Sequence, residues 1–109
     1  MANTFKLKTK ANVGVSTVGI YTAPAATTTV VIGITLSNTS GSGVNVGVGI
    51  TRAGTTEDVK LLKNSPIPQR SSLEFMGGNK VVLEPTDTLT VDSDTNNSVD
   101  AALTIMEIT

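Results

Sequence analysis

The chain has 109 residues, a formal net charge of −1, no cysteine, no histidine and only 3% aromatic residues. This length favours a single domain over residues 1–109, and 39% hydrophobic residues are enough for a core of Val, Ile, Leu and Ala. The missing residue types exclude disulfides and thiolate metal sites, and they remove the commonest metal ligand and general base. The balanced charge argues against nucleic-acid binding.

The N-terminal segment has no apolar run of the length that a signal peptide or a membrane span needs. We therefore expect synthesis in the cytoplasm without a cleaved signal, and no membrane partner. The first predicted strand, residues 4–10, places Lys6, Lys8 and Lys10 on one face. With few aromatic residues to stack bases, these lysines are typical of an edge strand that blocks further pairing.

Short strand signals bounded by Gly, Pro, Asn, Asp or Ser recur along the chain. They predict strands at 4–10, 19–22, 28–38, 44–52, 58–63, 71–75, 80–83, 88–92 and 99–108. No window of helical length carries an apolar stripe with helical spacing. The predicted fold is an all-β antiparallel sandwich, either jelly-roll or immunoglobulin-like.

Alternation of apolar residues along these strands predicts one buried face in each. The predicted core is Val30, Ile32, Ile34, Leu36, Val44, Val46, Val48, Ile50, Leu73, Val81, Leu83, Leu89, Val91, Leu103 and Ile105. Gly33, Gly47 and Gly49 fall on the opposite face. They either admit the backbone of another molecule or relieve crowding within the sandwich.

Four segments rich in Gly, Ser, Asn or Asp are expected to be tight turns. Residues 40–43, 76–79 and 92–98 are predicted to close hairpins, and 53–55 to form another tight turn. The four prolines lie between strands, where a missing N–H costs no ladder bond.

The segment from Asp92 through Asp94 to Asn96 resembles the opening of a calcium loop, with oxygen ligands at alternate positions. Continuing that register, the sixth position is Asn97 instead of Gly and the twelfth is Leu103 instead of Glu. A polar turn is the better interpretation.

The other candidates for chemistry are weaker. Glu57 and Asp58 are adjacent, so a strand points them to opposite faces. Ser71 and Ser72 have no histidine to activate them, and Gly77-Gly78 is too short for a phosphate cradle. The remaining acidic residues near strand ends are expected to be solvated surface charges: Glu74, Glu84 and Asp87. We predict no catalytic, cofactor-binding or metal-binding residue, and no enzyme activity.

The three aromatic residues, Phe5, Tyr21 and Phe75, could form a sugar-stacking platform. In a chain with few large side chains they are better interpreted as core fillers. A glycan site would require an exposed Tyr21, or an ion ordered at Asp92 and Asp94.

Several segments resemble the small virion structural proteins of tailed bacteriophages. They are IYTAP at 20–24 before a Thr-rich strand, PIPQRSS at 66–72, VVLEPTD at 81–87 with Asp87 in the acidic position, and the closing LTIMEIT at 103–109. The resemblance implies a β-sandwich part of a virus particle. Because a small domain without site chemistry can act on a particle only through contacts, we predict a capsid decoration or cement protein that binds the shell in many copies. Its partners would be the major capsid protein or tail proteins.

Two alternatives remain at this point. One is a tail, neck or baseplate component, and the other is a glycan-binding host-recognition module. The thin aliphatic core also predicts a homo-oligomer, because a small domain buries a smaller share of its surface than a large one.

Overall fold

The computed structural model describes residues 3–52, 57–75 and 80–109, which form strands and turns without any helix. In chain order the strands are β1 (Asn3–Val13), β2 (Val18–Thr22), β3 (Thr28–Asn38), β4 (Val44–Arg52), β5 (Glu57–Ile67), β6 (Ser72–Phe75), β7 (Val81–Leu83), β8 (Thr88–Ser93) and β9 (Val99–Ile108). The predicted strands are confirmed, with the largest difference at β5, which continues to Ile67. Within the described residues there is no helix that could cross a membrane.

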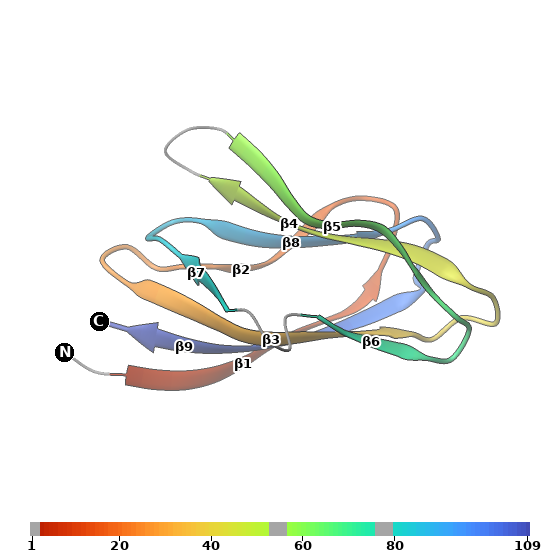
Figure 1. Ribbon diagram of the computed structural model, residues 1–109, viewed down its shortest axis with the longest axis horizontal. Helices are drawn as coiled ribbons and strands as arrows, with labels where there is room; N and C mark the ends of the chain where they lie inside the picture. The colour runs from red at the N-terminus through yellow and green to blue at the C-terminus, as the bar shows by residue number, and fades with distance from the viewer. Residues whose placement is uncertain (1–2, 53–56, 76–79) are drawn as a thin grey trace.

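The strands form two antiparallel sheets that face each other (Figure 1). Sheet I has the order β1-β9-β3-β6, with β7 also paired to β3, and sheet II has the order β2-β8-β4-β5. β6 pairs with the C-terminal half of β3 and β7 with its N-terminal half. This is the jelly-roll order of two four-stranded layers, with the strand next to β3 split in two. The predicted β-sandwich is confirmed.

Three of the predicted hairpins are wrong. Residues 40–43 lead from β3 in sheet I to β4 in sheet II, and residues 92–98 lead from β8 back to β9. β6 and β7 pair with β3 and not with each other, and residues 76–79, predicted to close a hairpin, lie outside the described residues. β4 and β5 do pair in antiparallel fashion, although the turn predicted at 53–55 also lies outside the described residues. A Gly-Ser segment encodes a change of direction, but not which strand becomes the partner.

The space between the sheets is filled by aliphatic side chains. The predicted core residues that are buried are Ile34, Leu36, Val44, Val46, Val48, Ile50, Leu83, Leu89, Val91, Leu103 and Ile105. Leu73 and Val81 are partly buried against this core. Sequence analysis missed the buried Val13, Ala23, Val31, Ile67, Val99 and Ala101.

A β-bulge in β3 overturns the prediction that Val30 and Ile32 belong to the core. Val31 pairs with Ile105 and Gly33 with Thr104, so Ile32 is the extra residue. Before the bulge Val31 points inward, and after it Ile34 does. Strict alternation from Ile34 back to Val30 therefore assigns the first half of the strand to the wrong face.

The glycines of β4 relieve crowding between neighbouring strands on the outer side of sheet II. A Cβ at Gly47 would lie 2.6 Å from Asp92 Oδ1, and one at Gly49 would lie 2.9 Å from the Val59 carbonyl oxygen. Neighbouring strands thus occupy the space that these glycines leave. Gly33 differs, because nothing lies within 4 Å of its Cβ position.

Candidate interaction surface

The outer face of sheet I carries a continuous row of apolar side chains. Phe5 pairs with Met106, Met106 with Val30, and Val30 with Val82, so the row crosses β1, β9, β3 and β7. Directly paired residues of an antiparallel sheet share a face, and on β9 the neighbours of Met106 are both buried. The row therefore lies on the side of the sheet away from the core.

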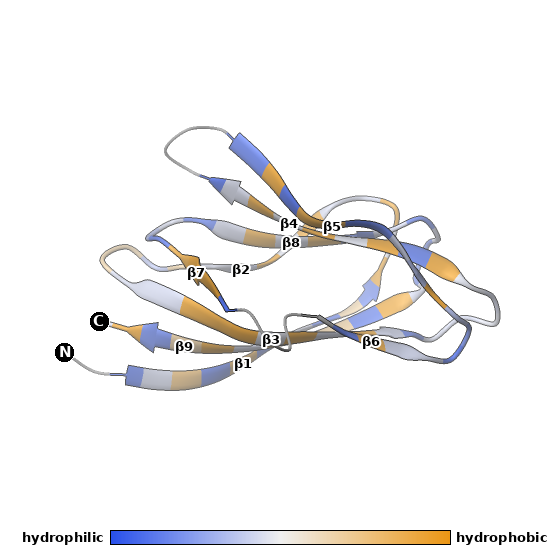
Figure 2. Ribbon diagram, viewed as in Figure 1, coloured by the Kyte–Doolittle hydropathy of each residue, from blue (hydrophilic) through white to orange (hydrophobic). Residues whose placement is uncertain are grey.

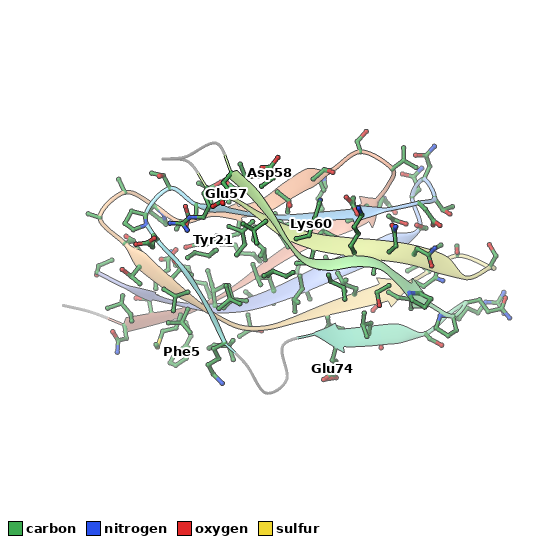
Figure 3. The ribbon with its side chains drawn as sticks, turned by 45° about the horizontal axis from the view of Figure 1, so that its top comes forward. Phe5, Tyr21, Glu57, Asp58, Lys60 and Glu74 are labelled. Atoms are coloured by element: carbon green, nitrogen blue, oxygen red, sulfur yellow. The ribbon has the colours of Figure 1, made fainter. Side chains whose placement is uncertain are left out.

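Phe5 and Val82, at the two ends of this row, are 69% and 55% exposed. The prediction that Phe5 fills the core is thus wrong: Figure 3 shows it outside sheet I, whereas Tyr21 lies between the sheets as predicted. The side chain of Phe75 lies outside the described residues. Leu7 (66% exposed) and the half-buried Ile108 flank the row. We call these six residues the apolar patch: Phe5, Leu7, Val30, Val82, Met106 and Ile108. Figure 2 shows hydrophobic positions on the strands that carry it.

Charge is nearly absent from this face. Among its described strand positions the charged residues are Asp100 on β9 and Glu74 on β6, both paired with the C-terminal half of β3. The solvated face of a sandwich sheet ordinarily alternates polar and charged side chains. A sheet face with an apolar row and little charge has the composition of the centre of an interface.

The orientation of the lysines of β1 explains part of the low charge on the outer face of sheet I. Lys6, Lys8 and Lys10 pair with Ile105, Leu103 and Ala101, so they point toward the core side of the edge strand. β1 is an edge strand, as predicted. Inward-pointing lysines at an edge disfavour the addition of another strand there.

One of these lysines belongs to a buried polar network. Lys6 Nζ lies 2.9 Å from Glu107 Oε1, and Tyr21 Oη donates a hydrogen bond of 2.6 Å to Glu107 Oε2. Tyr21 Oη also lies 2.8 Å from Thr29 Oγ1, and either hydroxyl can be the donor. The Tyr21 hydroxyl, and then Lys6, hold the pKa of Glu107 below its ordinary value, while burial and the nearby Glu107 raise the pKa of Tyr21 to about 12.

A shallow depression of about 270 Å³ lies on the same outer face, beyond the apolar patch. Small residues and hydroxyls make up most of its lining, together with two charged residues: Thr9, Lys10, Ala11, Thr35, Ser37, Asp100, Ala101 and Ala102. Thr9, Ala102 and Thr35 form one cross-strand row.

Asp87 contradicts the prediction of a solvated surface charge. It is 4% exposed, its Oδ2 lies 3.0 Å from Arg52 Nε, and the same oxygen accepts a hydrogen bond from the Glu84 amide. Arg52 also pairs with the exposed Glu84. The Thr86 amide donates a hydrogen bond to the Ala23 carbonyl, which joins the β7–β8 turn to the segment after β2. Through Arg52, Glu84 and Asp87 also join the β7–β8 turn to β4.

The side chains of the calcium-like segment bond to separate parts of the protein. Asp92 Oδ2 accepts a hydrogen bond from Thr17 and lies 3.8 Å from Lys60 Nζ. Asp94 Oδ1 accepts one from the Asn45 amide. These contacts fit the polar-turn interpretation. The described residues contain no group of three or more acidic side chains that could hold a metal ion.

The remaining candidates are not brought together. Glu57 and Asp58 are exposed neighbours on β5, shown in Figure 3 beside Lys60 on the far side of the molecule from Glu74. Ser71 Oγ donates to the carbonyl of Gln69 in a turn. Gly77-Gly78 lies outside the described residues.

Comparison with known proteins gives a likeness in fold alone. No family model matches the chain, and no curated protein matches it in sequence. It is similar to a solved structure from Bacillus endospore appendages, described as a novel family of disulfide-linked pili. The TM-score is 0.57 and the identity 14%, and the match covers 99% of this chain and 87% of that one.

Proposed function

We propose that the protein is a non-enzymatic virion structural protein of a tailed bacteriophage, a decoration protein that coats the capsid in many copies. The observation that carries this proposal is the outer face of sheet I, where an apolar row is exposed on a surface with little charge. A domain that acts through such a face acts by contact. Jelly rolls are also a recurring architecture of viral capsid proteins.

The chemistry of the polar residues supports the same proposal. Glu107, Asp87, Asp92 and Asp94 are each held by partners within the chain, so they serve the fold. The segments that resemble phage virion proteins include the VVLEPTD turn, whose two acidic residues bond to Arg52. Weak contacts suffice for a coat protein, because attachment at many points adds up over a shell.

A second candidate, a repeated subunit of a tail or fibre, is favoured by the likeness in fold to a pilus protein. That relative forms disulfide-linked pili. This chain has no cysteine, so any fibre it formed would be held without disulfides between these residues. The glycan-binding alternative loses its main requirement, because Tyr21 is buried and its hydroxyl is bonded to Glu107.

The test is co-sedimentation of the purified protein with purified capsids of the phage that encodes it, prepared without the protein. The proposal predicts saturable binding at a copy number that scales with the number of capsid subunits. Isolated tails of the same phage serve as the control. Binding to tails and not to capsids would replace decoration by the second candidate, and binding to neither would reject both.

A further inference from the structure

We infer that the protein dimerises by packing the outer face of sheet I against the same face of a second copy. The core of the interface would be the apolar patch. A two-fold symmetric interface uses the same patch on both subunits, so this patch must match itself in charge and in shape. This dimer would cover the face that carries the proposed function, so it applies to the free protein, before any attachment to a particle.

The charge of the face favours a second copy as the occupant. A partner with a charged surface would be matched by opposite charges, but the outward-facing strand positions that the structure describes carry Asp100 and Glu74, and Lys10 lines the depression beside them. All three lie away from the apolar row. Two copies can therefore meet along the row without bringing like charges together.

The apolar row is also arranged so that a two-fold axis can bring it against the same row of a second copy. A two-fold axis parallel to the strands, between β9 and β3, places Phe5 of one copy over Val82 of the other and Met106 over Val30. The most exposed side chains then meet across the interface, since Phe5 and Val82 are 69% and 55% exposed. The half-buried residues Met106 and Val30 lie at the centre of the interface.

The available apolar area is close to what a standard dimer interface uses. Counting the exposed fraction of each side chain, the patch offers on the order of 300–400 Å² of apolar surface. A standard interface buries about 800 Å² per partner, of which roughly 60% is non-polar, or about 480 Å². The patch supplies most of that non-polar share.

The edges of the sheet are a poorer route to association. Lys6, Lys8 and Lys10 point inward along β1, which disfavours strand addition at that edge. On the opposite edge the strand is divided between β6 and β7. Association through the face is thus favoured over a continuous sheet between copies.

Sedimentation velocity over a wide concentration range tests the dimer. The wild-type chain should sediment with about twice the mass of one 11.2 kDa chain. Phe5→Asp and Leu7→Asp should each weaken dimerisation by about 100-fold, because symmetry places each new charge in the interface twice. Val15→Asp is the matched control, since Val15 is 57% exposed in the bend between β1 and β2, outside the apolar patch. Circular dichroism confirms that each variant is folded.

A mixture of Phe5→Lys and Val82→Asp chains should restore dimers that neither variant forms alone, which tests the predicted arrangement. A wild-type monomer at all concentrations would overturn the inference, even if that monomer bound capsids through this face. A dimer insensitive to Phe5→Asp, or one broken by Val15→Asp, would also overturn it. The capsid co-sedimentation assay is scored separately, so either proposal can fail while the other stands.

Discussion

Substitution of Tyr21 by Phe removes a single oxygen from the centre of the buried network and leaves no cavity. In the wild type that hydroxyl bonds to a carboxylate at 2.6 Å and to Thr29 at 2.8 Å, and Thr29 is fully buried. A hydrogen bond to a charged group contributes about 1.5–3 kcal/mol, and a buried hydroxyl left without its partner adds to the cost. We expect a loss of about 2–4 kcal/mol in the free energy of unfolding at pH 7. At roughly 4–8 °C per kcal/mol, the melting temperature should fall by about 8–32 °C.

The pH dependence separates this network from a general packing defect. The pKa of Glu107 is lowered in the folded state, so its contribution is fully present above about pH 4.5 and is lost as the pH falls through the folded pKa. Because Tyr21 is the main cause of the lowered pKa, the deficit of Tyr21→Phe should shrink in acid. The pKa of Tyr21 is raised to about 12 in the folded state, so the unfolded chain loses this proton first as the pH rises above 10. The free energy of unfolding of the wild type should therefore fall by about 3 kcal/mol between pH 10 and 12, and that of the variant should not.

The assay is urea unfolding of both proteins at pH 3, 7 and 11. Thr22→Val is the matched control on the same strand, because its hydroxyl pairs with Thr88 at an exposed position and its loss should cost little. Equal stability of wild type and Tyr21→Phe at pH 7 would refute the reasoning. So would a deficit that stays constant from pH 3 to pH 7.

Three further tests of the fold use five substitutions. Val31→Asp should cost several kcal/mol, on the order of the whole stability, whereas Val30→Asp should leave the domain folded; the reverse order in a thermal melt would place the bulge elsewhere. Gly47→Ala should lower the free energy of unfolding in urea by about 1–3 kcal/mol, because the added Cβ meets Asp92. Gly33→Ala should change it by less than about 1 kcal/mol, and equal losses in the two variants would contradict the packing described. Asp87→Ala should lose about 2 kcal/mol in chemical unfolding, and a neutral result would show that the turn does not depend on its ion pair.

Local residue patterns were sufficient to predict the strands. β3, β4 and β9 begin and end where their apolar alternation and turn residues predict. Their partners were not predictable, because pairing depends on contacts far apart in the chain, such as β1 with β9. The same Gly-Ser residues that close a hairpin in one fold cross between sheets in this one.

The apolar patch could not be predicted from the sequence because two strands depart from the simple alternation of buried and exposed residues. The bulge at Ile32 shifts Val30 from the predicted core to the outer face. On β1, alternation of apolar residues with lysines suggests that Phe5 faces the core, but the lysines take the inner side of this edge strand. Lys6 can lie there because it forms an ion pair with Glu107 on β9. Alternation places Glu107 on the same face as the predicted core residues Leu103 and Ile105, but a carboxylate is not expected to be buried there.

Reconstruction of the purified particle, with every copy of this protein located, tests the central proposal most directly. The decoration proposal predicts many copies on the capsid lattice, each attached by surface contacts. A few copies along the tail axis, or no copies on the particle, would contradict it.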